Sequence, residues 1–99
     1  MKSVKFYPEA GSEMIQAASW YEEQQTDLGK RFLASVQDAL NRIKITPLLY
    51  PVVDGRTHRC LIRTFPFGII FRIETDCIFV VAVMHLHRAP NCWAGRSLE

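Results

Sequence analysis

The order of apolar and polar residues divides the chain into a helical first half and a strand-forming second half. From Pro8 to about Gln25, apolar residues recur at the spacing of one buried helix face, at Ala10, Met14, Ala17, Ala18 and Tyr21. Proline in the first turn with Glu9 beside it is typical of a helix start. The alternating residues Val4–Tyr7, ended by Pro8, predict a short strand before this helix.

A second helix is predicted directly after the first. Asp27 is a favourable N-cap residue, and apolar residues then repeat at helical spacing, at Leu28, Phe32, Val36, Leu40 and Ile43. Pro47 ends this helix because proline lacks the backbone N–H that a helix interior needs. The short polar link Gln24–Thr26 makes the two helices an αα-hairpin.

The second half predicts an antiparallel meander. Residues 47–55 contain two prolines and an Asp-Gly pair, which indicate an ordered crossover loop. Three strands follow, at Arg56–Phe65, at Phe67–Glu74 and from Cys77 to about Leu86. The last strand is apolar on both faces, so we expect the helices on one face and either the tail, Ala89–Arg96, or another protein on the other. The predicted fold class is α+β, with an N-terminal strand and a helical hairpin packed on an antiparallel sheet.

Length and composition fit a single domain, residues 1–97. The chain has 99 residues, of which 48% are hydrophobic and 22% charged, a globular balance. Leu98-Glu99 resembles a remnant of cloning. No apolar run approaches the roughly 20 residues of a membrane span, so we expect a cytoplasmic protein without membrane contact. Three cysteines without a C-x-x-C spacing favour reduced thiols.

Charge changes the picture through its placement. The net charge is only +2, but every cation after residue 50 is an arginine: Arg56, Arg59, Arg63, Arg72, Arg88 and Arg96. A guanidinium group binds phosphate or carboxylate through two parallel hydrogen bonds. The alternative is a solvated strand face on which arginine stems cover apolar surface.

Metal binding is not predicted. His58-x-Cys60, His85-x-His87 and Cys92 carry metal-binding atoms, but their spacings match no zinc signature. We therefore expect neither a metal nor another cofactor.

Several motifs resemble one protein family. They are Trp20-Tyr21, Leu28-Gly29-x-x-Phe32, Pro47-x-x-Tyr50-Pro51, Phe65-Pro66-Phe67-x-Ile69 and His85-x-x-Arg88-x-Pro90-x-x-Trp93-x-x-Arg96. In this order they resemble the RelE/ParE superfamily of toxins from bacterial type II toxin-antitoxin modules, which include plasmid stabilisation modules. The resemblance extends from Phe6 to Arg96.

The resemblance implies a growth-inhibiting toxin that a co-expressed antitoxin neutralises by wrapping the helical hairpin and the sheet. A homodimer, or a heterotetramer with the antitoxin, is the assembly to expect. Members of the superfamily either cut messenger RNA on the ribosome or poison DNA gyrase, and the fold does not distinguish these activities.

Metal-independent RNA cleavage would need a proton shuttle and cations on the phosphate. His85 or His87 would move the proton, with Arg63 and Arg88 on the phosphate. Strand alternation places Arg59 and Arg63 on one face, and Arg72 joins them if its register agrees. For partner or nucleic-acid binding the candidates are Arg59, Arg72, Trp93 and Arg96. All of these predictions assume that the side chains converge into one cationic patch.

Two departures from the family favour gyrase inhibition over RNA cleavage. Nuclease relatives use lysines and often a C-terminal tyrosine, whereas this chain has no lysine after Lys44 and no tyrosine after Tyr50. A net charge of +2 is also weak for a ribosome-directed protein. For the tail, the structural alternatives are that Trp93 covers the core and that Arg88 or Arg96 pairs with a helix carboxylate such as Glu13 or Glu22.

Overall fold

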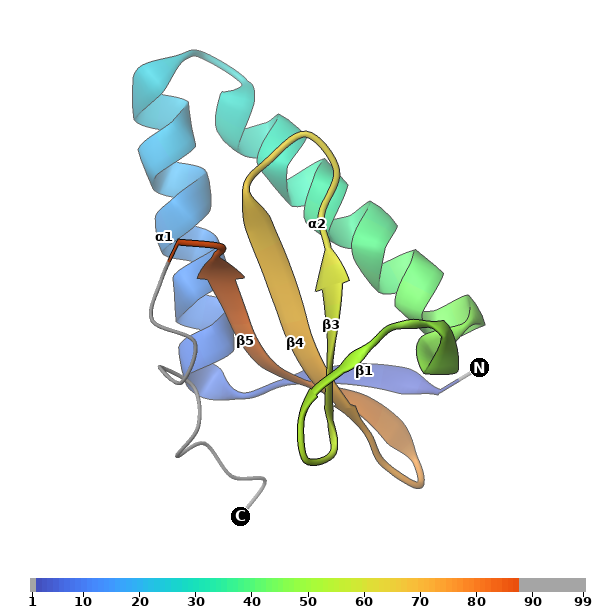
Figure 1. Cartoon of the computed structure of the whole chain (residues 1–99). Coiled ribbons are helices and arrows are strands. Elements are labelled where there is room, and N and C mark those ends of the chain that lie inside the picture. Colours follow the sequence, from blue (N-terminus) through green and yellow to red (C-terminus); the bar gives the residue numbers. More distant parts are fainter. Residues whose placement is uncertain (1, 88–99) are drawn as a thin grey trace.

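In the part of the chain that the structure describes, two helices cover one face of a five-stranded sheet (Figure 1). The structure is a computed structural model and describes residues 2–87. Its elements follow in the order β1 (Ser3–Phe6), α1 (Pro8–Gln24), α2 (Leu28–Ile45), the 3-10 turn η1 (Pro47–Leu49), β2 (Val52–Asp54), β3 (Thr57–Leu61), β4 (Phe67–Ile73) and β5 (Cys77–His85). The predicted α+β class, the helical hairpin and the three-stranded meander are confirmed.

The sheet has the strand order β1-β5-β4-β3-β2. The meander β3-β4-β5 is antiparallel, whereas β1 pairs with β5 in parallel, from Ser3 opposite Cys77 to Phe6 opposite Val80. The sheet is therefore mixed, and β5 lies inside it, as its apolar sequence predicts. Beyond Val80 the outer edge of β5 no longer faces β1 but lies next to α1 (Figure 1).

The segment 47–55 contains more structure than the predicted loop. Pro47 begins η1, and Val52–Asp54 forms β2, which pairs antiparallel with β3 across a turn at Gly55. Gly55 has a φ of 53°, which glycine adopts without steric cost and which explains the Asp-Gly turn signal. A strand of three residues between two turn signals is too short to give a visible alternation.

The predicted N-cap of α2 is wrong in its chemistry. Asp27 has a left-handed backbone with a φ of 70°, and its side chain makes no capping hydrogen bond. Glu22 of α1 performs this function instead. Its carboxylate accepts the N–H of Asp27 at 2.9 Å and the N–H of Gly29 at 3.0 Å. A carboxylate from the preceding helix thus satisfies donors that the first turn of α2 leaves unpaired.

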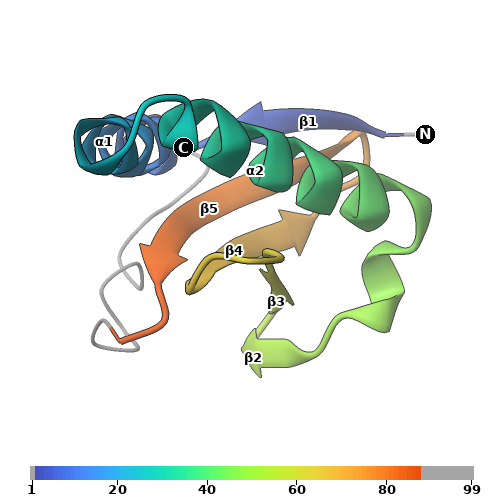
Figure 2. The same ribbon diagram turned by 90° about the horizontal axis from the view of Figure 1, so that it is seen from above.

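Close approach of the helices depends on Gly29. A Cβ atom at position 29 would lie 2.5 Å from the backbone oxygen of Ala18, well inside van der Waals contact. The two small residues let the backbones of α1 and α2 touch near the link that joins them. Figure 2 shows both helices on the same side of the sheet, and their apolar faces meet it there.

The alternation of side chains along β4 and β5 produces two buried clusters. Ile69, Phe71, Val80 and Val83 belong to the cluster that includes the helix residues Phe32, Val36 and Ile43. Neighbouring positions, Ile70, Val81, Ala82 and Met84, form a second cluster on the opposite face. The tail that we expect over that face lies outside the described residues. Within residues 2–87 no helix is both long and apolar enough to cross a membrane.

We predict opposite effects on stability for alanine substitutions at two glycines, one at the contact between the helices and one away from it. Gly29→Ala should lower the free energy of unfolding by about 1–3 kcal/mol, because the new methyl group forces the helices apart. Gly11→Ala in α1 meets nothing within 4 Å and should raise it by about 0.5–1 kcal/mol, since alanine favours helix. Urea unfolding followed by circular dichroism measures both. A stabilising Gly29→Ala would show that the helices are not in backbone contact.

Candidate functional site

The register of the sheet places two predicted arginines on the face without helices. Arg59 lies opposite Ile70, and Arg72 lies opposite Thr57. Because directly paired residues share a face, Arg59 and Arg72 lie on the same side as the second buried cluster. Their predicted common face is therefore present. The aliphatic stem of Arg59 covers Gly68, where a Cβ atom would lie 3.4 Å from its Cγ.

Arg72 is already engaged within the chain. Its Nε lies 3.8 Å from a carboxylate oxygen of Glu74, which also lies 3.6 Å from Arg56. The guanidinium of Arg72 is 6.0 Å from the centre of the Phe79 ring. In contrast, Arg59 is exposed and makes no ion pair among the residues that the structure describes. Of this pair, Arg59 has the charge that an external partner can reach.

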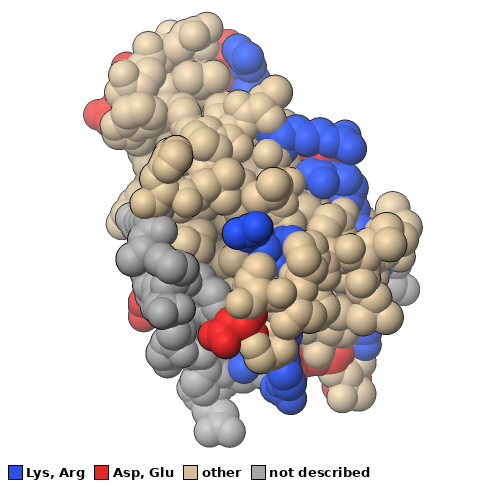
Figure 3. Space-filling view, viewed as in Figure 1, with Lys and Arg blue, Asp and Glu red and all other residues tan. Residues whose placement is uncertain are grey.

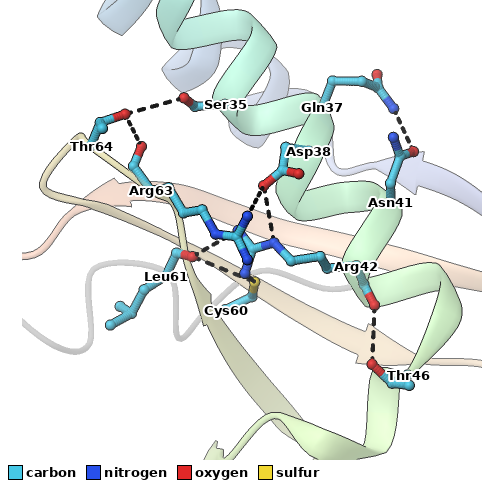
Figure 4. Close-up of polar contacts among 10 residues, drawn as sticks. All are labelled: Ser35, Gln37, Asp38, Asn41, Arg42, Thr46, Cys60, Leu61, Arg63 and Thr64. Atoms are coloured by element: carbon cyan, nitrogen blue, oxygen red, sulfur yellow. Dashed lines mark hydrogen bonds and ion pairs between the residues drawn. The ribbon is translucent and has the colours of Figure 1, made fainter.

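Arg63 does not lie on a strand, contrary to the sequence prediction. Strand β3 ends at Leu61, and Arg63 belongs to the loop before β4. Its guanidinium lies 3.8 Å from a carboxylate oxygen of Asp38 in α2 (Figure 4). Arg42 contacts the same oxygen at 3.1 Å and donates to the backbone oxygen of Leu61 at 3.3 Å. Arg63 is thus held beside α2, away from the face that carries Arg59.

The loop between β3 and β4 explains this placement. Thr64 has a φ of 67°, a strained conformation for a β-branched residue. The next residue, Phe65, packs its ring against Tyr21 and Phe32, with ring centres 4.8 and 5.2 Å apart. Packing of this partly buried aromatic ring against the core offsets the strain and turns Arg63 toward α2. A continued strand would have put Phe65 and Arg63 on one face.

Cys60 fills part of the hydrophobic core. It is fully buried beneath this loop, and burial raises the pKa of its thiol. The Sγ atom lies 3.7 Å from an Arg42 nitrogen. Cys60 and Cys77 are both unbridged. Among residues 2–87, no three histidine, cysteine or acidic side chains come together as a metal site.

His85 and His87 lie close together at the end of β5. Their ring centres are 5.1 Å apart, and the backbone N–H of His87 donates to Nδ1 of His85 at 3.1 Å. This bond requires an unprotonated Nδ1, so the proton of a neutral His85 ring is on Nε2. The His85 ring also meets the edge of Phe67 at 5.2 Å. His85 lies opposite Phe67, on the helix side of the sheet.

A cavity of about 530 Å³ opens between α1 and the ends of β4 and β5. We call it the α1–β5 pocket. Its lining comprises Glu13, Gln16, Ala17, Trp20, Tyr21, Pro66, Phe67, Val83 and His85. Trp20 is 56% exposed at its rim. Concave apolar sites with a few convergent polar groups are typical binding sites.

Glu13 and Gln16 line this pocket, although the sequence prediction did not name either of them as a site residue. The Oε1 atom of Glu13 accepts the backbone N–H of Val83 at 3.1 Å, on the edge of β5 beyond β1. From the sequence, Glu13 was named only as a helix carboxylate for pairing with Arg88 or Arg96. The available signal was spacing, because Glu13, Ala17 and Trp20 lie at i, i+4 and i+7 on one helix face.

Within residues 2–87, the predicted residues therefore do not form one cationic patch. Arg59 and Arg72 lie on the helix-free face, Arg63 beside α2, and His85 in the α1–β5 pocket. On the face shown in Figure 3, Lys and Arg atoms also form separate groups. The remaining predicted site residues, Arg88, Trp93 and Arg96, lie outside the described residues 2–87.

No family model matches the sequence, and no curated protein matches it significantly. Among solved structures, a chain from the chromosomal ParDE TA system from P. aeruginosa superimposes with a TM-score of 0.62. The two chains share one fold. The match covers 86% of this chain and 96% of the ParDE chain, at 18% sequence identity. The likeness to the ParDE chain therefore spans the architecture almost completely, while most residues differ.

We expect the Tyr21 phenol to contribute to the loss of stability at alkaline pH. Burial raises the pKa of its phenol above the ordinary value of about 10, so the folded chain holds this proton more tightly than the unfolded chain. The contribution of the protonated Tyr21 phenol to the free energy of unfolding is fully present below about pH 10 and is lost as the pH rises through the folded-state pKa.

Tyr21→Phe should therefore make the free energy of unfolding decline less steeply above about pH 10. The free energy of unfolding of the variant should still decline somewhat, because burial also raises the pKa values of Tyr50 and Cys60. Urea titrations at about pH 8, 9, 10 and 11 measure the slope of the free energy of unfolding against pH. The free energy of unfolding measured near neutrality corrects for the packing that the variant loses. Identical slopes for both proteins would contradict this role.

Proposed function

We propose that the chain is the toxin of a type II toxin-antitoxin module and that a cognate antitoxin neutralises it. The observation that carries this proposal is the match in fold to the ParDE chain over 86% of the present chain. The motif order from Trp20-Tyr21 to His85-x-x-Arg88 supports it independently, because those residues resemble RelE/ParE toxins. The proposed partner is an antitoxin protein.

Within this proposal, the toxin acts by binding and inhibiting DNA gyrase, and it does not cut RNA. Metal-independent RNA cleavage places a proton shuttle and phosphate-binding cations around one scissile bond. In the described part of the chain, His85 faces α1, Arg63 is bound to Asp38, and Arg59 lies on the opposite face of the sheet. This separation favours a binding surface over a nuclease centre.

The surface proposed for the target is the helix-free face around Arg59. Its guanidinium is exposed, and its stem lies over Gly68 beside Leu86, which is 42% exposed. The combination of a cation with adjoining apolar surface is typical of residues that contribute strongly to protein–protein binding. We also propose that the C-terminal residues Arg88, Trp93 and Arg96 take part in binding the target.

The module and its target are tested together. Induced expression in bacteria should arrest growth, and co-expression of the protein encoded by the adjacent gene should restore it. Purified protein should block supercoiling by gyrase while leaving ribosome-bound messenger RNA intact. Transcript ends that depend on translation, with normal supercoiling, would instead identify the endonuclease activity of RelE-like toxins. Normal growth and normal supercoiling would contradict both activities.

Two arginines provide a matched test of the target surface. Arg59→Ala should raise the concentration needed for half-inhibition of supercoiling by about tenfold, the scale of one buried interfacial contact. Arg56→Ala removes an equal charge that is already paired with Glu74, and it should change inhibition less than about twofold. Equal effects of the two substitutions would place the target surface elsewhere.

A further inference from the structure

The surface that follows the end of α2 carries a concentration of exposed apolar side chains. Half of the large apolar residues that are exposed among residues 2–87 lie between positions 45 and 53. Ile45 is 70% exposed, Leu48 82% and Leu49 76%, and Val52 and Val53 of β2 are exposed as well. We call these five residues the η1–β2 patch. Exposed apolar surface that gathers in one segment is typical of protein interaction sites.

The segment that carries the patch is anchored to the rest of the chain. The N–H of Arg59 in β3 donates to the backbone oxygen of Pro51 at 3.0 Å. The ring of Tyr50 packs edge to face on Phe71, with ring centres 6.1 Å apart. The tyrosine between η1 and β2 therefore binds the segment to the core, while the leucines before it stay outside. A surface that is already held in place loses little conformational entropy on binding.

The patch includes one edge of the sheet. Strand β2 is the last in the order β1-β5-β4-β3-β2, and among the described residues only β3 pairs with it (Figure 2). Edge strands are usually protected by lysine, by proline or by a covering segment. Val52 and Val53 supply neither a charge nor a proline. Backbone N–H and C=O groups on the outer side of β2 are therefore available to another chain over a short contact.

Two opposite charges border the patch. Lys44 comes directly before Ile45, Asp54 comes directly after Val53, and residues 45–53 contain no charge. Among the residues that the structure describes, neither Lys44 nor Asp54 makes an ion pair. A surface with one positive and one negative border is complementary to its own copy, because a two-fold rotation exchanges the two borders. An unrelated partner would need the same two charges in reverse order.

From these observations we propose that the η1–β2 patch binds a second copy of this chain in a two-fold dimer. Lys44 of each copy lies beside Asp54 of the other copy, and the apolar side chains between these charges pack against their counterparts. The patch is smaller than the roughly 20–30 residues on each side of a standard interface, so the dimer is weak and forms as the protein concentration rises. This proposal does not depend on the identity of the target or of the antitoxin.

Sedimentation equilibrium of the full chain tests the dimer. From micromolar to submillimolar concentration, the protein should show a reversible equilibrium between monomer and dimer. Leu49→Glu should raise the dissociation constant at least about tenfold, because each dimer would then bury two unpaired carboxylates in its apolar contact. Ile15→Glu is the matched control, since Ile15 is also exposed but lies on α1 outside the patch, and this variant should dimerise like the unchanged protein. Circular dichroism checks that both variants fold.

Exchange of the border charges tests the two-fold arrangement. Lys44→Glu opposes two acids at each contact and Asp54→Lys opposes two lysines, so each variant alone should dimerise about fivefold more weakly. An equimolar mixture of the two variants should recover the original affinity, because both contacts of the mixed dimer again join an acid to a base. Lys30→Glu, on α2 outside the patch, is the control. Its mixture with Asp54→Lys still opposes two lysines at one contact and should not recover the affinity.

Several outcomes would overturn the proposal. A chain that stays monomeric over the whole concentration range would do so, as would a dimer that Ile15→Glu weakens as much as Leu49→Glu. A mixture of the two border variants that dimerises no better than either variant alone would exclude the two-fold contact.

Two results would assign the patch to a different occupant. A monomeric chain that dimerises only as Trp93→Ala would show that residues 88–99 of the same chain cover the patch. A monomeric chain whose Leu49→Glu variant no longer binds the protein encoded by the adjacent gene would show that this protein covers it. None of these measurements uses growth arrest or gyrase inhibition, so failure here is distinguishable from failure of the proposed function.

Discussion

The contact of the two helix backbones at Gly29 and Ala18 sets the geometry of the rest of the molecule. Because position 29 has no side chain, the first turn of α2 rests on the carbonyl of Ala18, and the Glu22 carboxylate reaches the N–H groups of Asp27 and Gly29. The angle fixed there brings the apolar faces of both helices onto one side of the sheet. It also places Tyr21 against Phe32, and with it the wall of the α1–β5 pocket.

Most of the fold could be predicted because periodicity reports burial directly. The helices begin and end where proline and the apolar repeats indicate, and the double-sided apolar pattern of β5 follows from its interior position. The end of β3 was less predictable. Ile62 and Phe65 continue an apolar pattern, yet Phe65 packs against the core, partly buried, from a loop strained at Thr64. A loop that packs large apolar residues has the composition of a strand.

The candidate site was predicted less well because a sequence does not specify which positions of different elements become neighbours. Alternation correctly placed Arg59 and Arg72 on one face once the register was known. Arg63 and His85 were assigned to the same patch by residue type alone. Asp38 of α2 binds Arg63, and His85 lies on the helix-covered face of the sheet, opposite to the face that carries Arg59. Glu13 and Trp20 were not predicted to line one pocket, since the strand edge that completes it lies 70 residues away from Glu13 at Val83.

The parallel pairing of β1 with β5 also governs when the domain can form during synthesis. Ser3 pairs with Cys77 and Phe6 with Val80, so the first strand has its sheet partner only after more than three quarters of the chain has been made. A nascent chain that lacks β5 exposes an unpaired strand and the apolar faces of both helices. Within the described residues, folding of the sheet during synthesis is therefore completed by β5, and a translation product that lacks β5 cannot assemble this sheet.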